Sequence, residues 1–142
     1  MLLLCVALIA GCGGPQRPPG FPTLYACVLT FQFADGSPVA GAMVSLRPEN
    51  TAMDQWSISG VTDSSGVARI FTRSDFAGAP AGSYKILIRQ QETFNTGALD
   101  EDGQPIIELR SLLNERYGNA STTPLTLEVP SQAVRESFTI ER

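Results

Sequence analysis

Residues 33–48 read Phe-Ala-Asp-Gly-Ser-Pro-Val-Ala-Gly-Ala-Met-Val-Ser-Leu-Arg-Pro and carry the strongest fold signal in the chain. An alternating apolar run ends at Phe33, and the tight-turn sequence Asp-Gly-Ser-Pro follows it. A second alternating run then places Ala42, Val44 and Leu46 on one face. The stretch therefore predicts the opening hairpin of a small β-domain, with Phe33, Ala42, Val44 and Leu46 buried in its core.

Further alternating runs, separated by turn residues, extend this pattern along the chain. Asp63 and Gly66 mark one such turn, because Asp63 can hydrogen-bond its own backbone and Gly66 can take a positive φ. The runs on either side of that turn predict a second hairpin. The predicted strands cover residues 25–33, 42–47, 56–62, 67–72, 84–89, 125–129 and 138–140. About seven short strands at this spacing are typical of an all-β, antiparallel two-sheet sandwich.

The alternating pattern stops between residues 90 and 118. Residues 98–105 are polar and rich in turn formers, whereas Ile106, Leu109 and Leu112 recur at a spacing close to that of a helix. We therefore predict one long loop that holds a short helix over residues 106–117, lying on the sandwich. Such a long excursion from a compact domain is usually functional or mobile.

Length and composition indicate one globular domain, since the chain has 142 residues, of which 43% are hydrophobic and 17% charged. The formal net charge is -4 and the few cationic side chains are scattered, which leaves no basic patch for a nucleic acid. The chain contains no histidine. These counts argue against a nucleic-acid partner and against catalysis that depends on histidine as a general base or metal ligand.

The N-terminal segment has the features of an export signal. Residues 2–10 form an apolar run that is too short for a bilayer, which takes about 20 residues. The sequence Ile-Ala-Gly-Cys at residues 9–12 resembles the bacterial lipobox, whose cysteine receives the lipid and becomes the mature N-terminus. We expect residues 1–11 to be a lipoprotein signal peptide and Cys12 to carry the lipid. The alternatives are an ordinary secretory signal cleaved near Gly11 and a buried strand that contains a cysteine.

The segment after Cys12 predicts a spacer. Residues 12–23 are rich in proline and glycine, and the prolines cannot pair in the interior of a sheet, so we expect a semi-extended tether between the membrane and a domain at residues 24–142. With Cys5 in the signal and Cys12 lipidated, Cys27 is alone in the mature domain and no internal disulfide can form. Cys27 shares the alternation of its strand, which predicts a small buried hydrophobic residue rather than a reactive thiol.

Four stretches, taken in order, resemble the carboxypeptidase regulatory-like, transthyretin-like domains. They are residues 35–48, residues 62–68 (Thr-Asp-Ser-Ser-Gly-Val-Ala), residues 79–86 (Ala-Pro-Ala-Gly-Ser-Tyr-Lys-Ile) and residues 116–127 (Arg-Tyr-Gly-Asn-Ala-Ser-Thr-Thr-Pro-Leu-Thr-Leu). The chain is similar in particular to small single-domain lipoproteins of planctomycete-type bacteria, over residues 25–142. The resemblance implies a seven-stranded prealbumin-like sandwich. It implies no enzyme, because in carboxypeptidases this module accompanies the catalytic domain.

Three kinds of chemistry lack residues that they require. Residues 100–103 (Asp-Glu-Asp-Gly) could be half of a calcium loop, but the later ligands are missing, so a solvated acidic turn is preferred. Hydrolysis of 5-hydroxyisourate, known in some transthyretin-like proteins, relies on histidines and a C-terminal tetrapeptide that this chain lacks. A serine triad is not expected, because the chain has no histidine to act as its base. We therefore expect no catalytic residue, no metal and no cofactor.

Aromatic side chains offer one candidate ligand contact. Tyr84 and Tyr117 are expected to pack inside, whereas Trp56 follows a polar loop and is the fair surface candidate. Our leading hypothesis is a cell-envelope protein, lipid-anchored through Cys12 on the periplasmic or outer face, whose non-catalytic sandwich serves as an interaction or structural module. The alternative is a carbohydrate-binding module, with the Trp56 loop and residues 90–118 as its contact surface. The expected partners are the membrane and an envelope protein or glycan.

Overall fold

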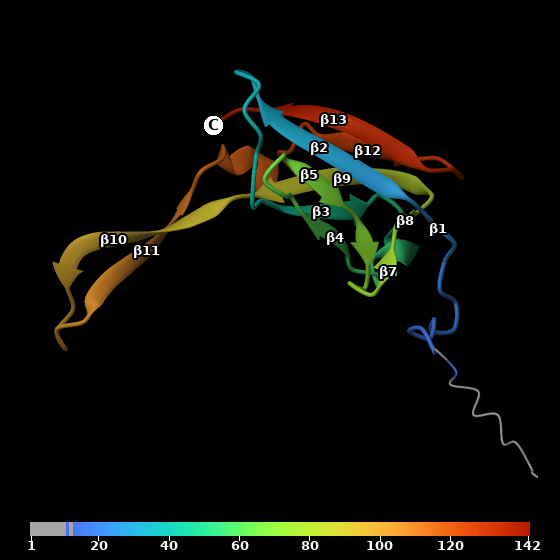
Figure 1. Ribbon diagram of the computed structural model, residues 1–142, viewed down its shortest axis with the longest axis horizontal. Helices are drawn as coiled ribbons and strands as arrows, with labels where there is room; N and C mark the ends of the chain where they lie inside the picture. Colours follow the sequence, from blue (N-terminus) through green and yellow to red (C-terminus); the bar gives the residue numbers. More distant parts are fainter. Residues whose placement is uncertain (1–10, 12) are drawn as a thin grey trace, which may run out of the picture.

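A computed structural model describes residue 11 and residues 13–142. The domain is built from two β-sheets packed face to face (Figure 1). The larger sheet contains, in spatial order, β12 (Thr126–Val129), β9 (Gly82–Arg89), β3 (Met43–Pro48), β4 (Ile58–Val61), β6 (Phe71–Thr72) and β7 (Phe76–Ala77). The smaller sheet contains β13 (Val134–Ile140), β2 (Cys27–Phe33) and β5 (Val67–Arg69). β1 (Leu24–Tyr25) pairs with β8 (Ala79–Pro80). Each of the seven predicted strands overlaps an observed one, so the all-β sandwich is confirmed.

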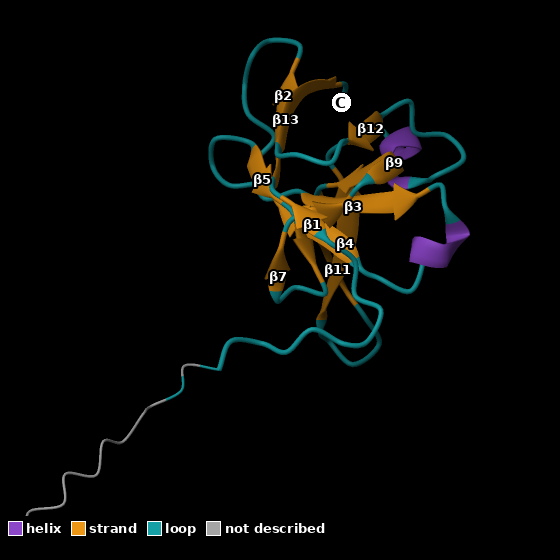
Figure 2. Ribbon diagram, turned by 90° about the vertical axis from the view of Figure 1, so that its right-hand side faces the viewer, coloured by secondary structure: helices purple, strands orange, loops and turns teal. Residues whose placement is uncertain are grey.

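Strands dominate the described residues, and helical structure is limited to two short 3-10 helices (Figure 2). These are η1 (Thr51–Met53) and η2 (Glu115–Gly118), which lie outside the two sheets. No helix in the described part of the chain is long and apolar enough to cross a membrane. All but one of the strand pairs are antiparallel, and the exception is the parallel pair of β13 and β2.

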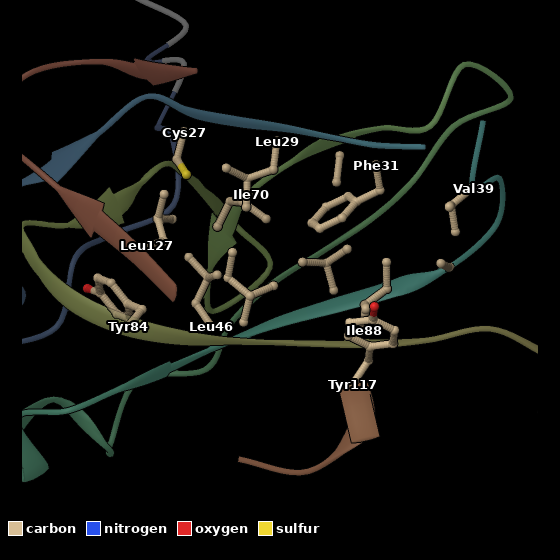
Figure 3. Close-up of a cluster of buried hydrophobic side chains, with 14 of the residues drawn as sticks. Cys27, Leu29, Phe31, Val39, Leu46, Ile70, Tyr84, Ile88, Tyr117 and Leu127 are labelled. Carbon is tan, nitrogen blue, oxygen red and sulfur yellow. The ribbon is translucent and has the colours of Figure 1, made fainter. Parts of the chain in front are cut away.

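The core lies between the two sheets and is built from the inward residues of alternating strands (Figure 3). The four residues of the opening stretch predicted to be inward, Phe33, Ala42, Val44 and Leu46, are all buried. Cys27 is buried too. Alternation along β2, β3 and β9 thus places one side of each strand in the core, as the period-2 pattern predicts.

The opening stretch is not a simple hairpin, because β2 and β3 lie in different sheets. The chain first turns back at Gly36 (φ 86°), and Val39 N–H donates to the Phe31 carbonyl at 3.0 Å. It then crosses from the smaller sheet to the larger one. Val39 and Ala42 are fully buried at this crossing, so the connection is part of the core rather than a surface loop.

The second predicted hairpin is divided between the sheets in a similar way. β4 belongs to the larger sheet and β5 to the smaller one, whereas β6 pairs antiparallel with β4. Ile70, between β5 and β6, is buried where the chain changes sheets. The turn itself is as predicted, because the Asp63 carboxylate accepts from Ser65 N at 2.8 Å and Gly66 has φ 77°.

The prediction of one long loop that holds a helix over residues 106–117 is wrong. The first half of that range belongs to β11 (Pro105–Ser111), which pairs antiparallel with β10 (Gln91–Leu99). The helical spacing was misleading because Leu109 is 69% exposed and therefore carries no information about a buried helix face. Helical structure is limited here to η2, whose Tyr117 packs into the core.

Candidate functional site

The hairpin of β10 and β11, residues 91–111, projects beyond the sandwich and is called the arm (Figure 1). Every residue of β10 and β11 is exposed except Thr96, which is half-buried. The arm continues the direction of β9, from which it is separated by Gln90 alone. It therefore adds surface to the molecule without adding to its core.

The first strand of the arm is fixed to the sandwich at its base. The Gln90 side-chain amide donates to the Ala40 carbonyl at 2.5 Å, and the Arg89 guanidinium donates to the Gly118 carbonyl at 2.6 Å. Leu112 N–H donates to the Gln90 carbonyl at 2.8 Å and closes the base of the hairpin. These contacts hold the arm in one direction relative to the domain.

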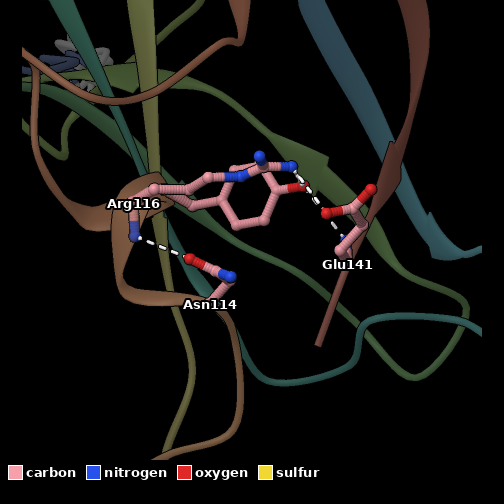
Figure 4. Close-up of polar contacts among 4 residues, drawn as sticks. Asn114, Arg116 and Glu141 are labelled. Carbon is pink, nitrogen blue, oxygen red and sulfur yellow. Dashed lines mark hydrogen bonds and ion pairs between the residues drawn. The ribbon is translucent and has the colours of Figure 1, made fainter.

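The second strand is fixed through η2 and the end of β13 (Figure 4). Asn114 caps η2 by accepting from Arg116 N at 3.2 Å, and the Arg116 guanidinium donates to the Glu141 carboxylate at 2.7 Å. The hydroxyl of buried Tyr117 accepts from Glu141 N and from Arg116, each at 3.1 Å. The Tyr117 hydroxyl and, less strongly, the Glu141 charge raise the pKa of Arg116.

The two faces of the arm differ in character, because residues opposite one another in an antiparallel pair point to the same side. The neutral face is formed by three pairs in which neither residue carries a charge: Gln91 with Ser111, Thr93 with Leu109, and Asn95 with Ile107. On this face Leu109 is 69% exposed and Ile107 is 50% exposed. The neutral face therefore presents two exposed apolar side chains among uncharged polar ones, and nothing in the described chain covers it.

The charged face is formed by two pairs, Glu92 with Arg110 and Phe94 with Glu108. The Arg110 guanidinium lies 3.3 Å from the centroid of the Phe94 ring and 3.9 Å from the Glu108 carboxylate. Arg110 thus contacts both Phe94 and Glu108 on this face. The two faces of the arm thus differ in charge, although both are exposed.

The acidic tip of the arm, residues 100–102, lies in a tight turn. The Asp100 carboxylate accepts from Asp102 N at 2.9 Å and from Gln104 N at 2.8 Å, so one of its oxygens is used by the turn. Within the described residues, no group of three or more His, Cys, Asp or Glu side chains is placed to hold a metal ion. Glu101 and Asp102 are exposed at the end of the hairpin.

Trp56, the predicted ligand contact, is half-buried and packs against the core. Its ring meets Phe21 edge to face at 5.0 Å between centroids, and Phe21 in turn lies 4.7 Å from the ring of Phe76. Phe21, within the segment predicted as a tether, thus packs on the domain. Trp56 also lines a groove of about 460 Å³ over the outer side of β3 and β9, together with Arg47 and Arg89.

The remaining predicted residues fall into two groups. Cys12, the predicted lipid site, lies outside the described residues. Tyr84 and Tyr117 are buried, which confirms their prediction as packing residues. Burial, assisted by the charge of Glu136, raises the pKa of the Cys27 thiol to about 12, so it is protonated at neutral pH and a poor nucleophile.

Comparisons with known proteins identify no relative that shows a family. No protein-family model matches the chain, and no curated protein matches it. Among solved structures, the major pilin subunit of Bacillus cereus has a TM-score of 0.47 and 20% identity, over 86% of this chain and 31% of the pilin chain. A 9R-lipoxygenase from Cyanothece has a TM-score of 0.37 and 14% identity, over 90% of this chain and 18% of its own. The chain thus spans less than a third of either protein, and the resemblance to carboxypeptidase regulatory-like domains stays a prediction.

Proposed function

We propose that the chain is a lipid-anchored cell-envelope protein whose non-catalytic β-sandwich holds the arm for contact with another protein. The observation that carries this proposal is the neutral face of the arm, on which Leu109 and Ile107 are exposed although the core of the sandwich is complete without them.

The arm is a two-stranded hairpin that pairs with no strand of the two sheets. Two-stranded hairpins are marginal in water, and exposed apolar patches with free strand edges favour association. Eight large apolar side chains are exposed in the described part of the chain, and five of them lie in the arm: Phe94, Leu99, Ile106, Ile107 and Leu109. A partner on the neutral face would cover Ile107 and Leu109, which would remove part of this unfavourable exposure and stabilise the hairpin.

The arrangement along the long axis suits a tethered module. The described residues before β1 and the arm lie at opposite ends of the molecule (Figure 1). A lipid on Cys12 would therefore hold one end at the membrane while the arm extends from the other. Labelling cells with a fatty-acid analogue tests the anchor, since Cys12→Ser should abolish the label that the parent protein carries.

Site-specific photo-cross-linking in intact cells tests the function of the arm. A photoreactive amino acid at position 109 should give covalent adducts with a protein, because this side chain is at the centre of the neutral face. The same amino acid at Ser137, which is exposed on β13 of the smaller sheet, is the matched control and should give none. The proposal fails if positions 107 and 109 give no protein adduct.

A second candidate function, carbohydrate binding, is favoured by the groove at Trp56. Amphipathic rings beside planar polar groups suit sugars, and Asp54 and Gln55 line the same groove. On a glycan array, saturable binding that is lost in Trp56→Ala but kept in Phe21→Ala would support this function. Phe21 is the matched control because it contacts Trp56 but does not line the groove. An array without any bound glycan would argue against it.

A further inference from the structure

We infer that the protein bound by the arm is a second copy of this chain, and that each arm docks on the outer side of the larger sheet of the other copy. The inference rests on the proposed function of the arm as a protein-binding element, and it names the partner and the docking surface. It is carried by the distribution of charge and of exposed apolar side chains over the two surfaces.

The formal net charge of the arm equals that of the whole chain. It holds five of the 14 acidic residues, at positions 92, 100, 101, 102 and 108, but only one of the ten basic residues, Arg110. The arm is therefore at -4, which equals the net charge of the chain, and the rest of the sequence balances to zero. In the described part of the chain, the pair of Glu108 with Arg110 is the one ion pair of an arm carboxylate.

The outer side of β3 and β9 has the opposite charge. Arg47 and Lys85 are direct cross-strand neighbours, and Arg89 follows on the same side of β9 opposite Met43. β3, β4 and β9 contain no acidic residue. Arg47, Arg89 and the half-buried Lys85 thus lie on two adjacent strands that carry no carboxylate. The nearest carboxylates on this side are Asp54, which lines the same groove, and Glu128 on the neighbouring strand β12, so cations outnumber carboxylates there by three to two.

The same surface offers apolar contacts. Met43 and Val61 are cross-strand neighbours and each is 59% exposed. The groove of about 460 Å³ and a second groove of about 410 Å³ both include Met43, so the surface is hollowed on either side of this residue. Apolar side chains of a neutral hairpin face, such as Leu109 and Ile107, can enter such hollows while acidic groups at the tip meet the cations.

The arm does not lie on the larger sheet of its own chain. Its base is fixed by Gln90, Arg89 and Arg116, and the hairpin projects beyond the sandwich (Figure 1). Two copies related by a two-fold axis can each give an arm and receive one, which doubles the contact made by a narrow hairpin. An isologous exchange of this kind also closes, so it leaves no arm free for a chain of copies.

Charge-swap variants of the full chain, studied by analytical ultracentrifugation in mild detergent, test the docking surface. The tip variant Glu101→Lys/Asp102→Lys and the sheet variant Arg47→Glu/Lys85→Glu should each weaken the dimer, raising its dissociation constant about tenfold or more through like-charge contacts. A one-to-one mixture of the two should restore dimers, because each arm then meets a sheet of opposite charge. The control Arg135→Glu, on the smaller sheet, should leave the dissociation constant unchanged.

The outcomes separate this inference from the proposed function. A monomeric parent protein whose position 109 cross-links to a different protein overturns the second-copy partner and leaves the proposed function standing. Absence of any adduct from positions 107 and 109 overturns both. A dimer that neither charge swap weakens overturns the docking of the arm on the larger sheet.

Discussion

Replacing Gly66 by alanine should destabilise the sandwich far more than the same change at Gly36. Both glycines have a left-handed backbone, with φ of 77° and 86°. A Cβ on Gly66 would lie 2.3 Å from the Phe31 carbonyl oxygen and 3.2 Å from Val39 N, whereas a Cβ on Gly36 meets nothing within 4 Å. The two positions thus share the conformational cost and differ in the close approach.

The size of the difference follows from this comparison. A left-handed alanine costs about 1–2 kcal/mol, and the entropic effect on the unfolded chain is the same for both variants. At Gly66 the backbone of β2 must also move, because the Phe31 carbonyl accepts from Val39 N and Phe31 N–H donates to the Gly66 carbonyl. Overpacking of this kind costs about 1–3 kcal/mol more. We expect losses of about 1–2 kcal/mol for Gly36→Ala and about 2–5 kcal/mol for Gly66→Ala.

Urea denaturation followed by circular dichroism measures both free energies of unfolding on one scale. The difference between the variants isolates the close approach of Gly66 to β2. If the two variants differ by less than about 0.5 kcal/mol, the packing of this turn against Phe31 is refuted. Equal m-values in the parent and both variants are needed for the comparison, because a changed m-value reports a changed denatured or native state.

The other predictions concern the core, the base of the arm and the buried thiol. In urea denaturation, Leu109→Ala on the exposed neutral face should cost less than about 0.5 kcal/mol, whereas Ile86→Ala in the core should cost about 2–5 kcal/mol. Tyr117→Phe removes the acceptor for Glu141 N and should cost about 1 kcal/mol, with faster hydrogen exchange at the base of the arm but not in β2. Burial raises the pKa of the Cys27 thiol from 9.0 in the unfolded chain to about 12 in the folded protein. The folded state therefore keeps a proton that the unfolded chain loses, and the free energy of unfolding should fall as the pH rises above about 9. Cys27→Ala should therefore flatten the fall in stability measured between pH 8 and 10.5, and an unchanged slope would contradict the burial of this thiol.

The core was predictable because burial leaves a local trace. Val44 and Leu46 alternate with Met43 and Ser45, and this period-2 pattern reports which side of a strand is inward whatever its partner is. The pairing of one strand with another leaves no such local pattern in the sequence. Residues 33–48 predict a hairpin, yet β2 and β3 lie in different sheets, since an alternating run specifies a face but not a neighbour.

The arm was missed because its apolar residues are not in the core. Ile107 and Leu109 alternate with Glu108 and Arg110, which is a strand signal, but Ile106 and Leu112 complete an equally good helical spacing. Burial usually decides between two such periods, and here it could not. The base of the arm was out of reach for a different reason, since Arg116 and Glu141 meet across 25 positions of sequence.

The location of the charge decides between a lipid and a protein surface for the exposed leucine and isoleucine of the arm. From composition alone, a net charge of -4 describes a weakly acidic chain with scattered cations. The structure sorts these charges into a neutral remainder and an arm that ends in three consecutive acidic residues, 100–102. Anionic headgroups repel such a tip, and inserting it into a bilayer would bury carboxylates without partners. The inferred partner of the arm is therefore a protein surface that presents cations to the acidic tip, such as Arg47, Lys85 and Arg89 on the outer side of β3 and β9.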